Sequence, residues 1–215
     1  MTEPTLVEAR ESPVRALAIE GRVDDATVAA LRLYGREVLS FLVSLHRDEA
    51  GASEVFSEFS EELWKALPGF RWQCSLRTFA YTIARRASWR FRKDGRRSPE
   101  RNLPLSQGAV SQIAAEVRSE TASYLRAEAR SKLAKIRDEL APEDRALLVL
   151  RIDKQLAWNE VARVLHADND QFGEDDVKRE SARLRKRFEL LKKKLVDLGK
   201  KHGLVAVKPV DGDRG

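Results

Sequence analysis

The sequence predicts an all-α fold of two small helical domains joined by a linker. Apolar residues recur at intervals of three and four along several segments, as the buried stripe of an amphipathic helix requires, and no segment shows the two-residue period of a strand. Charged residues make up 34% of the 215 residues and apolar residues 42%, a balance that suits a soluble helical protein. The stripes fall into two groups with a polar stretch between them, and this division predicts two domains.

The first group of helices lies in residues 26–97, after a mixed and weakly periodic segment, residues 1–25, that we expect to be a flexible arm. The stripe of the first helix consists of Leu31, Tyr34, Val38, Phe41, Leu42 and Leu45. The stripe of the second consists of Ala52, Val55, Phe56, Phe59, Leu63, Ala66 and Leu67. Pro68-Gly69 ends this second helix. The third helix begins near Ser75, and its apolar face consists of Leu76, Phe79, Ala80, Ile83, Ala84 and Ala87.

The second group of helices lies in residues 123–198. A helix over residues 125–140 ends at Ala141-Pro142, because proline disfavours a helical residue before it and suits a helix start. Further helices are expected over the apolar run in residues 145–152, the short amphipathic segment 156–165 and the long basic segment 177–198. Residues 98–122 form a polar linker with some helical character, and residues 199–215, with glycine, proline and charge, predict a flexible tail.

Charge is distributed unevenly along the chain. The net charge is +6 and the pI is near 9.5, which weakly favours a polyanionic partner. Residues 47–62 carry six acidic residues and one basic residue, whereas residues 178–201 carry eleven basic residues and three acidic ones. We therefore expect different surfaces of the protein to bind different partners.

Several classes of protein are disfavoured by what the sequence lacks. Cys74 is its one cysteine, so neither an intrachain disulfide nor a zinc site built on cysteines is expected. No apolar run of about 18 residues and no apolar signal core is present, so we expect a cytoplasmic protein without a membrane partner. Nucleotide-binding and nucleophile motifs are missing, and the three histidines share no metal-ligand spacing. We expect neither an enzyme nor a bound cofactor or metal.

Residues 70–97 hold nine basic residues, one acidic residue and six aromatic residues. Aromatic rings on which bases stack, interleaved with cations that follow the phosphates, are what a single-stranded nucleic acid requires. At about 100° per residue, one side of the third helix gathers Arg77, Tyr81, Arg85, Ser88 and Arg92, with Trp89 beside them. This segment predicts a surface for single-stranded nucleic acid. The alternative is a basic amphipathic helix whose rings all belong to the core.

Residues 157–165 and 177–187 are a short helix rich in small residues and a basic helix that follows it, a pair that is typical of a helix-turn-helix. In that motif the second helix enters the major groove, where Arg and Lys bind guanine edges and phosphates. A plain helical hairpin is the alternative, and the long connection, residues 166–176, favours it.

This connection resembles half of a calcium-binding loop, through Asp168, Asp170 and Gly173. Phe172 and Arg179, however, occupy positions at which such a loop needs oxygen ligands for calcium. We therefore expect an acidic loop without calcium.

The second helix of the first group has an acidic side, formed by Glu54, Glu58, Glu61 and Glu62. Solvated glutamates are common on isolated helices. Beside a DNA-binding helix, however, an acidic surface repels DNA, and we therefore expect it to face a basic protein partner.

Taken together, these segments resemble a bacterial RNA polymerase sigma factor of the extracytoplasmic-function type, in the sigma-70 family. Residues 31–93 look like region 2 of that family, through the helix from Glu54 to Trp64, the exit Leu67-Pro68-Gly69-Phe70-Arg71 and the run Ser75-Leu76-Arg77-Thr78-Phe79. Residues 133–195 look like region 4, through Leu140-Ala141-Pro142, Trp158-Asn159-Glu160-Val161-Ala162 and the basic helix from Val177. The two stretches follow the order and spacing of the family.

The resemblance implies three binding surfaces. The acidic helix would bind the clamp helices of the polymerase largest subunit, through Glu54, Glu58, Glu61 and Trp64. The third helix and the loop before it would capture and melt the −10 promoter element, through Trp72, Arg77, Tyr81, Arg85, Arg86, Trp89 and Arg92. The last helix would read the −35 element, through Lys178, Arg179, Arg183, Arg185 and Lys186. The family also implies contacts with the polymerase flap, and an anti-sigma factor as a partner in many relatives.

The chain departs from the family at Ser57, where glutamine is usual, at Arg86, where asparagine is usual, and in the longer turn between the region 4 helices.

The sequence is also compatible with three other functions. A helix-turn-helix regulator that works without core polymerase would bind palindromic sites as a symmetric dimer. An enzyme acting on nucleic acid would need a cluster of acids or a metal site, and a sigma-like regulator would have lost promoter function.

Overall fold

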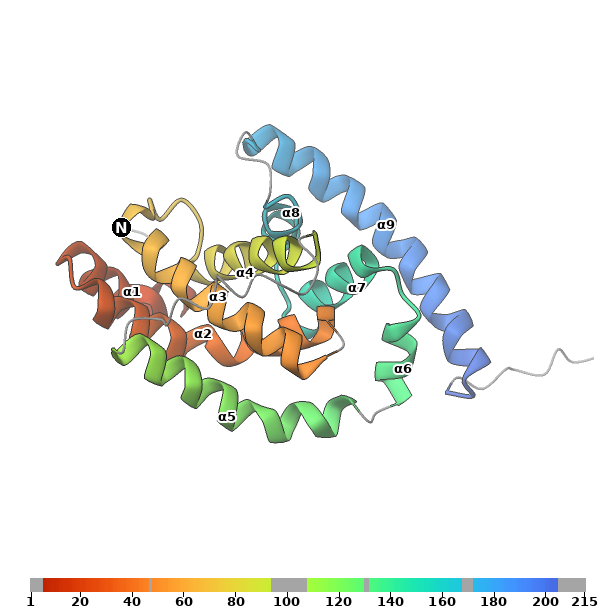
Figure 1. The fold of residues 1–215 in the computed structure, drawn as a ribbon. Helices are drawn as coiled ribbons and strands as arrows, with labels where there is room; N and C mark the ends of the chain where they lie inside the picture. Colours follow the sequence, from red (N-terminus) through yellow and green to blue (C-terminus); the bar gives the residue numbers. More distant parts are fainter. Residues whose placement is uncertain (1–5, 47, 94–107, 130–131, 168–171, 205–215) are drawn as a thin grey trace, which may run out of the picture.

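The computed structural model describes residues 6–46, 48–93, 108–129, 132–167 and 172–204, with the side chains of all of these except 122–129 and 132–134 (Figure 1). Every regular element in these residues is a helix, which confirms the all-α prediction. The α-helices are α1 (Leu6–Ile19), α2 (Val23–His46), α3 (Glu49–Ala66), α4 (Leu76–Lys93), α5 (Ala109–Ala129), α6 (Lys132–Asp138), α7 (Pro142–Leu148), α8 (Trp158–Leu165) and α9 (Glu174–Lys201). Two shorter elements are η1 (Leu67–Gly69), a 3₁₀ turn, and η3 (Val149–Asp153), a π-helical turn. None of the described helices has both the length and the apolar character that crossing a bilayer requires.

Helix α2 lies at the centre of the first half, where it packs against α1, α3, α4 and α5 (Figure 1). The apolar stripes predicted for this helix and for α3 are confirmed as core: Tyr34, Phe41, Phe56 and Phe59 are at most 3% exposed. The end of α3 before Pro68-Gly69 also follows the prediction. The spacing of apolar residues therefore located the buried sides of both helices correctly.

The N-terminal segment differs from the flexible arm that we expected. Residues 6–19 form α1, which packs on α2 although Pro13 lies inside it. Val14 is 2% exposed and Glu11 is 5% exposed. The segment lacks a wide apolar stripe, so its periodicity is weak. It docks through Val14, Leu17 and Ala18 and through the buried carboxylate of Glu11, whose partners lie far along the chain.

The segment interpreted as a polar linker contains most of α5, which packs on α2 and α3. A buried row of small and branched side chains forms the contact, and it consists of Val110, Ile113, Ala114 and Val117. Gly35 of α2 allows this approach, since a Cβ atom there would lie 3.3 Å from a methyl group of Val117. Arg118 donates to the Ser57 hydroxyl at 2.6 Å. The described part of this segment thus completes the core of the first half.

The second half begins at α6 and α7, on either side of Ala141-Pro142. Pro142 is the first residue of α7, and the helix break that we predicted there is present. Arg145 is 2% exposed, and its guanidinium donates to the carbonyl oxygens of Arg137, Asp138 and Leu140 at 2.9, 3.2 and 3.0 Å. It thereby ties the end of α6 to α7. The single helix expected over residues 125–140 is instead divided between the end of α5 and α6.

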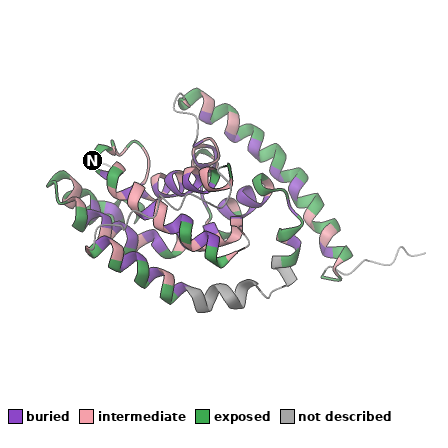
Figure 2. Ribbon diagram, viewed as in Figure 1, coloured by how far each residue is buried: buried purple, intermediate pink, exposed green. Residues whose placement is uncertain are grey.

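Helices α8 and α9 complete the second half, and α9 runs along its outer edge (Figure 1). One side of α9 is buried and the other is exposed (Figure 2). The buried side consists of Val177, Ser181, Leu184, Phe188 and Leu191. Trp158 of α8 meets Phe188 edge to face, with ring centroids 5.5 Å apart. The connection between the two helices covers residues 166–173, and Asp168 and Asp170 of the rejected calcium loop lie outside the described residues.

His46 joins the end of α2 to the end of α4. Its imidazole lies 2.9 Å from the Ser88 hydroxyl and meets Phe91 edge to face. Burial, and then the positive charge of Arg92, lowers the pKa of His46 from 6.5 to about 4. The folded protein therefore holds this imidazole neutral at physiological pH.

We predict that part of the stability is lost as pH falls from 6.5 towards 4. Over that range the unfolded chain takes up a proton on His46 that the folded protein excludes, so acid favours unfolding. At pH 5 the loss is about 1–2 kcal/mol. Urea denaturation across this pH range measures it, with His46→Asn as the control that keeps a polar side chain without a titrating ring. An identical pH dependence in both proteins would contradict a neutral buried His46.

Candidate nucleic-acid and polymerase interfaces

The loop between η1 and α4 is shaped by aromatic rings. Phe70 stacks on Phe79 of α4 with centroids 4.1 Å apart and an interplanar angle of 10°. Trp72 lies against Phe70 and has a left-handed backbone, with φ of 57°, which is uncommon for a residue other than glycine. The guanidinium of Arg15 in α1 lies 5.5 Å from the centre of the Trp72 ring. The loop is therefore held from two sides, by α4 and by α1.

The first turn of α4 is capped by a side chain from α1. The Glu11 carboxylate accepts hydrogen bonds from the backbone amides of Leu76 and Arg77 at 2.8 and 3.0 Å. It also accepts a hydrogen bond from the Tyr34 hydroxyl at 2.7 Å. A carboxylate at a helix N-terminus satisfies free amides and interacts favourably with the helix dipole. Glu11 is not predicted from the sequence, because its partners are 23 to 66 positions away and no local motif marks them.

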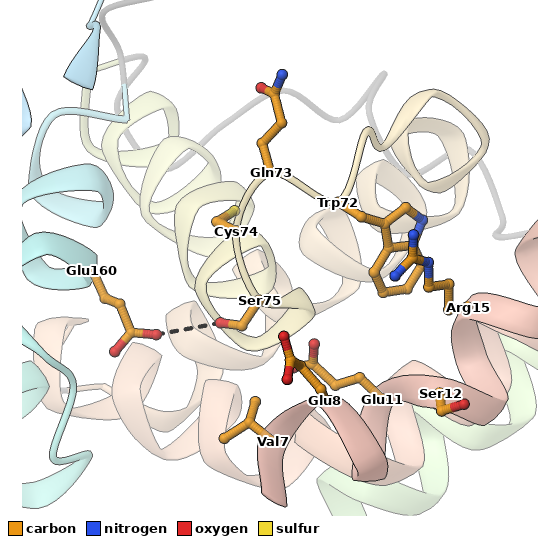
Figure 3. A pocket seen from close by; sticks show the side chains of 10 residues that line it. All are labelled: Val7, Glu8, Glu11, Ser12, Arg15, Trp72, Gln73, Cys74, Ser75 and Glu160. Carbon is orange, nitrogen blue, oxygen red and sulfur yellow. Dashed lines mark hydrogen bonds between the residues drawn. The ribbon is translucent and has the colours of Figure 1, made fainter. Parts of the chain in front are cut away.

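A hollow of about 390 Å³ opens between α1, this loop and α8 (Figure 3). Its walls include Glu8 and Glu11 from α1, Trp72 and Cys74 from the loop, and Glu160 from α8. Burial raises the pKa of the Cys74 thiol. The hollow is thus lined by residues from both halves of the protein, next to the first turn of α4.

Three of the predicted −10 residues on α4 make contacts within the protein. Arg77 donates to Glu37 of α2 at 2.9 and 2.8 Å and to the carbonyl oxygen of Lys154 at 2.8 Å. Tyr81 is 0% exposed, and burial raises its pKa. Arg85 is 7% exposed and lies 3.9 Å from Glu143 of α7. We expected this side of α4 to lie open, but α8 packs over it while α2 packs beside it.

The remaining predicted −10 residues are spread over more exposed positions. Trp89 is 43% exposed, with the Lys93 ammonium 4.9 Å from the centre of its ring. Trp72 and Arg92 are half-buried. Arg86, also half-buried, donates to the carbonyl oxygen of Ala167 at the end of α8. The structure therefore brings together the start of α4 and the loop, and places Trp89 near the other end of the helix.

The acidic side of α3 is partly paired with α4. Arg90 of α4 donates to Glu58 at 3.2 Å and also pairs with Glu62. Glu54, one turn before Glu58, is exposed. A single arginine thus reduces the negative charge at the centre of the predicted polymerase-binding side.

The other two residues predicted to bind polymerase lie towards the end of α3. Glu61 pairs with Lys65 one turn further along. Trp64 is half-buried, and its indole donates to Asp24 at the start of α2 at 2.7 Å. Both side chains are therefore held in place by neighbours, and each keeps part of its surface accessible.

The predicted −35 residues all lie on the exposed side of α9. They are Lys178, Arg179, Arg183, Arg185 and Lys186. The first three have side chains that are 77%, 78% and 79% exposed, and each pairs with an acid three positions earlier in the helix, namely Asp175, Asp176 and Glu180. Pairs of this kind between exposed side chains are weak, so phosphates compete with them readily. Within the described residues, no three side chains of the types that ligate metals lie together.

The fold and its charged surfaces define a helical protein with separate acidic and basic faces. Residues 30–98 match the family model for sigma-70 region 2, a range that includes most of α2 and all of α3 and α4. This part of the chain is similar to sigma-70 region 2, and the match supports a relation to the sigma-70 family, whose members are non-enzymatic transcription initiation factors. The domain supports a role in binding RNA polymerase and melting promoter DNA. No curated protein and no solved structure matches the chain.

We predict that Glu11→Ala destabilises the protein by about 2–3 kcal/mol, because it leaves two backbone amides and one hydroxyl without their acceptor. Urea denaturation measures the change. Glu20→Ala is the control, since Glu20 directly follows the same helix and forms an exposed ion pair with Arg22; it is expected to stay within about 0.5 kcal/mol of the natural protein. Equal effects of the two substitutions would contradict the capping role of Glu11.

Proposed function

We propose that the protein is a sigma factor of the extracytoplasmic-function type, which directs core RNA polymerase to promoters by recognising −10 and −35 elements. The observation that carries this proposal is the region 2 match over residues 30–98, which falls on the helices with the acidic and the basic-aromatic sides. The protein itself would catalyse no reaction and would act in the cytoplasm, where the polymerase works. An anti-sigma factor remains a partner that only the resemblance suggests.

The proposed polymerase-binding surface is the acidic side of α3, with Glu54, Glu58, Glu61 and Trp64. Glu54 is exposed, and the other three keep part of their surface accessible. Arg90 competes for Glu58, so a basic partner helix would have to replace an existing ion pair at that position. Glu54 is therefore the residue at which we expect a polymerase contact to form with the least rearrangement.

The proposed −35 reader is the outer side of α9. Its five basic residues are exposed along the N-terminal half of the helix, while the opposite side packs on α7 and α8. This is the division that a recognition helix needs, because one side must enter the major groove while the other is held by the domain. With α8 as the supporting helix, the pair forms a helix-turn-helix whose turn, residues 166–173, is unusually long.

The proposed −10 surface is the loop with Trp72 and the accessible part of α4. Trp89 and Trp72 offer ring faces, and Arg77, Arg86 and Arg92 offer cations. The six aromatic residues of this segment divide between two roles. Tyr81 packs edge to face on Phe41, Phe91 meets His46 edge to face, and Phe70 and Phe79 stack on one another. The two tryptophans are left as the candidates for stacking on bases.

Run-off transcription with purified core polymerase and a pool of promoter fragments tests the proposal. Transcripts that depend on the protein, with start sites that share two upstream elements, would establish the function. If the protein neither supports transcription nor comigrates with core polymerase, the proposal fails. A symmetric dimer bound to a palindromic site would then favour a helix-turn-helix regulator that works alone.

We predict that Arg183→Ala weakens binding to duplex DNA about tenfold and reduces its dependence on salt, because one exposed cation is removed from the outer side of α9. Lys192→Ala is the control on the same helix, beyond the proposed groove-reading part. Trp89→Ala is expected to leave duplex binding unchanged but to reduce promoter opening. Gel-shift titrations at several salt concentrations and permanganate footprinting measure these effects. Equal loss of duplex affinity in Arg183→Ala and Trp89→Ala would refute the division between the two surfaces.

A further inference from the structure

The connection between α8 and α9 is longer than the turn of an ordinary helix-turn-helix. It covers residues 166–173, whereas about three or four residues usually suffice and set the angle between the two helices. A longer connection restrains that angle less, because more backbone dihedrals lie between the helices. If α9 is to present the same side chains to every duplex, contacts between side chains have to supply the missing restraint.

His166, the first residue after α8, makes such a contact with α9. Its Nε2 atom lies 3.1 Å from the Glu180 carboxylate in the second turn of α9. Its ring stacks on Phe172, just before α9, with centroids 4.8 Å apart and an interplanar angle of 14°. Phe172 packs in turn against the hydrophobic core. One imidazole therefore joins the end of α8 to the start of α9 at two points.

A second ion pair joins the same parts of the two helices, but it is more open to water. Arg163 of α8 pairs with Glu174 in the first turn of α9, and the Glu174 side chain is 72% exposed. The Glu180 side chain is only 15% exposed, and that of His166 is 35% exposed. Because water screens exposed pairs and leaves them weak, the contact between His166 and Glu180 is better able to hold α9.

Glu180 also connects this contact to the proposed −35 surface. The guanidinium of Arg183, one turn further along α9, lies 3.6 Å from the same carboxylate, and the Arg183 side chain is 79% exposed. On the opposite side of the helix, Val177 and Leu184 are buried in the core. The carboxylate of Glu180 thus lies between the connection and a cation that we expect to read DNA.

We propose that His166 and Glu180 are positioning residues, which take the place of a short turn and set how α9, and Arg183 on it, meets a duplex. This role rests on the proposed function, since it concerns the residues that would read the −35 element. Attraction to phosphates tolerates a small rotation of a helix, whereas bonds to base edges require a fixed geometry. Loss of the pair therefore reduces discrimination between sequences more than it reduces affinity for duplex DNA in general.

Substitutions of His166 separate its two contacts. His166→Phe keeps a ring for Phe172 and removes the nitrogen that faces Glu180, whereas His166→Gln keeps a nitrogen donor and removes the ring. His202→Phe is the matched control. His202 likewise pairs with a glutamate, Glu139, but it lies just after the far end of α9.

The charge of Glu180 needs a control of its own, because removal of any acid makes the protein more basic and raises its affinity for every duplex. Glu180→Gln is therefore compared with Glu189→Gln. Glu189 lies on the same helix, and its side chain is 64% exposed beside Lys192. Both variants lose one negative charge, but only Glu180→Gln loses the carboxylate that faces His166. The double variant His166→Phe/Glu180→Gln tests whether the two residues act together.

Sequence discrimination is measured on the full chain. The natural protein first selects a preferred duplex from a library of random sequence, and each variant is then titrated with that duplex and with a scrambled duplex of the same composition. We expect His166→Phe and Glu180→Gln to lower the ratio of the two affinities about fivefold, and the double variant to lose no more than either single one. We expect His166→Gln to lose less than His166→Phe, and both controls to keep the natural ratio.

Two results would overturn the inference: an unchanged ratio in His166→Phe, or an equal fall of the ratio in Glu180→Gln and Glu189→Gln. Circular dichroism and urea denaturation establish that each variant is folded at the temperature of the titrations. A variant that is unfolded there is replaced in the comparison by the other member of the pair, since either substitution removes the same contact.

Run-off transcription with the natural protein is scored separately. If the natural protein selects no sequence, both the positioning role and the reading of a −35 element fail. If it selects a sequence and supports transcription, but the variants keep the natural ratio, the proposed function stands and the positioning role fails. If the variants lose discrimination and the natural protein supports no transcription, the positioning role stands and the sigma factor role fails.

Discussion

Helix α4 is packed on more than one side, and much of the remaining architecture follows from that constraint. Helices α2 and α3 cover its apolar face, Glu11 of α1 caps its first turn, and α8 lies along a further side. A helix buried to this extent must satisfy its polar side chains inside the protein, because unpaired buried groups are costly. Arg77 and Thr78 do so through Glu37, Glu160 and the Lys154 carbonyl. The same bonds therefore join the two halves of the chain.

The arginines of α4 illustrate how one residue type serves two purposes. Arg90 pairs with Glu58 and Glu62 of α3 and so joins neighbouring helices within the region 2 domain. Arg86 instead donates to a backbone carbonyl oxygen of the second half, whereas Arg77 donates both to the Lys154 carbonyl and to the Glu37 carboxylate. A bond to a carbonyl oxygen can be replaced by a bond to a phosphate without leaving a carboxylate unpaired. This difference makes Arg86 the better candidate for exchange between an internal contact and a nucleic acid.

The two proposed DNA surfaces differ in how they are built. The outer side of α9 carries weak pairs between exposed neighbours, so it offers cations with little rearrangement. The proposed single-strand surface at α4 instead shares its cations with internal hydrogen bonds.

The sequence by itself determined the helical class, the buried stripes of α2 and α3, the helix break at Pro142 and the exposed basic side of α9, because each depends on neighbours within a few turns. It also located the region 2 segment, whose motifs are local. The docking of α1, the packing of α5 on α2 and the covered side of α4 were decided by the tertiary structure. Glu11 carries the first of these contacts and Glu160 the last, with partners 23 to 85 positions away, while α5 packs on α2 through apolar side chains. Periodicity reports which side of a helix is buried but not which helix covers it, and a lone buried carboxylate leaves no periodic pattern at all.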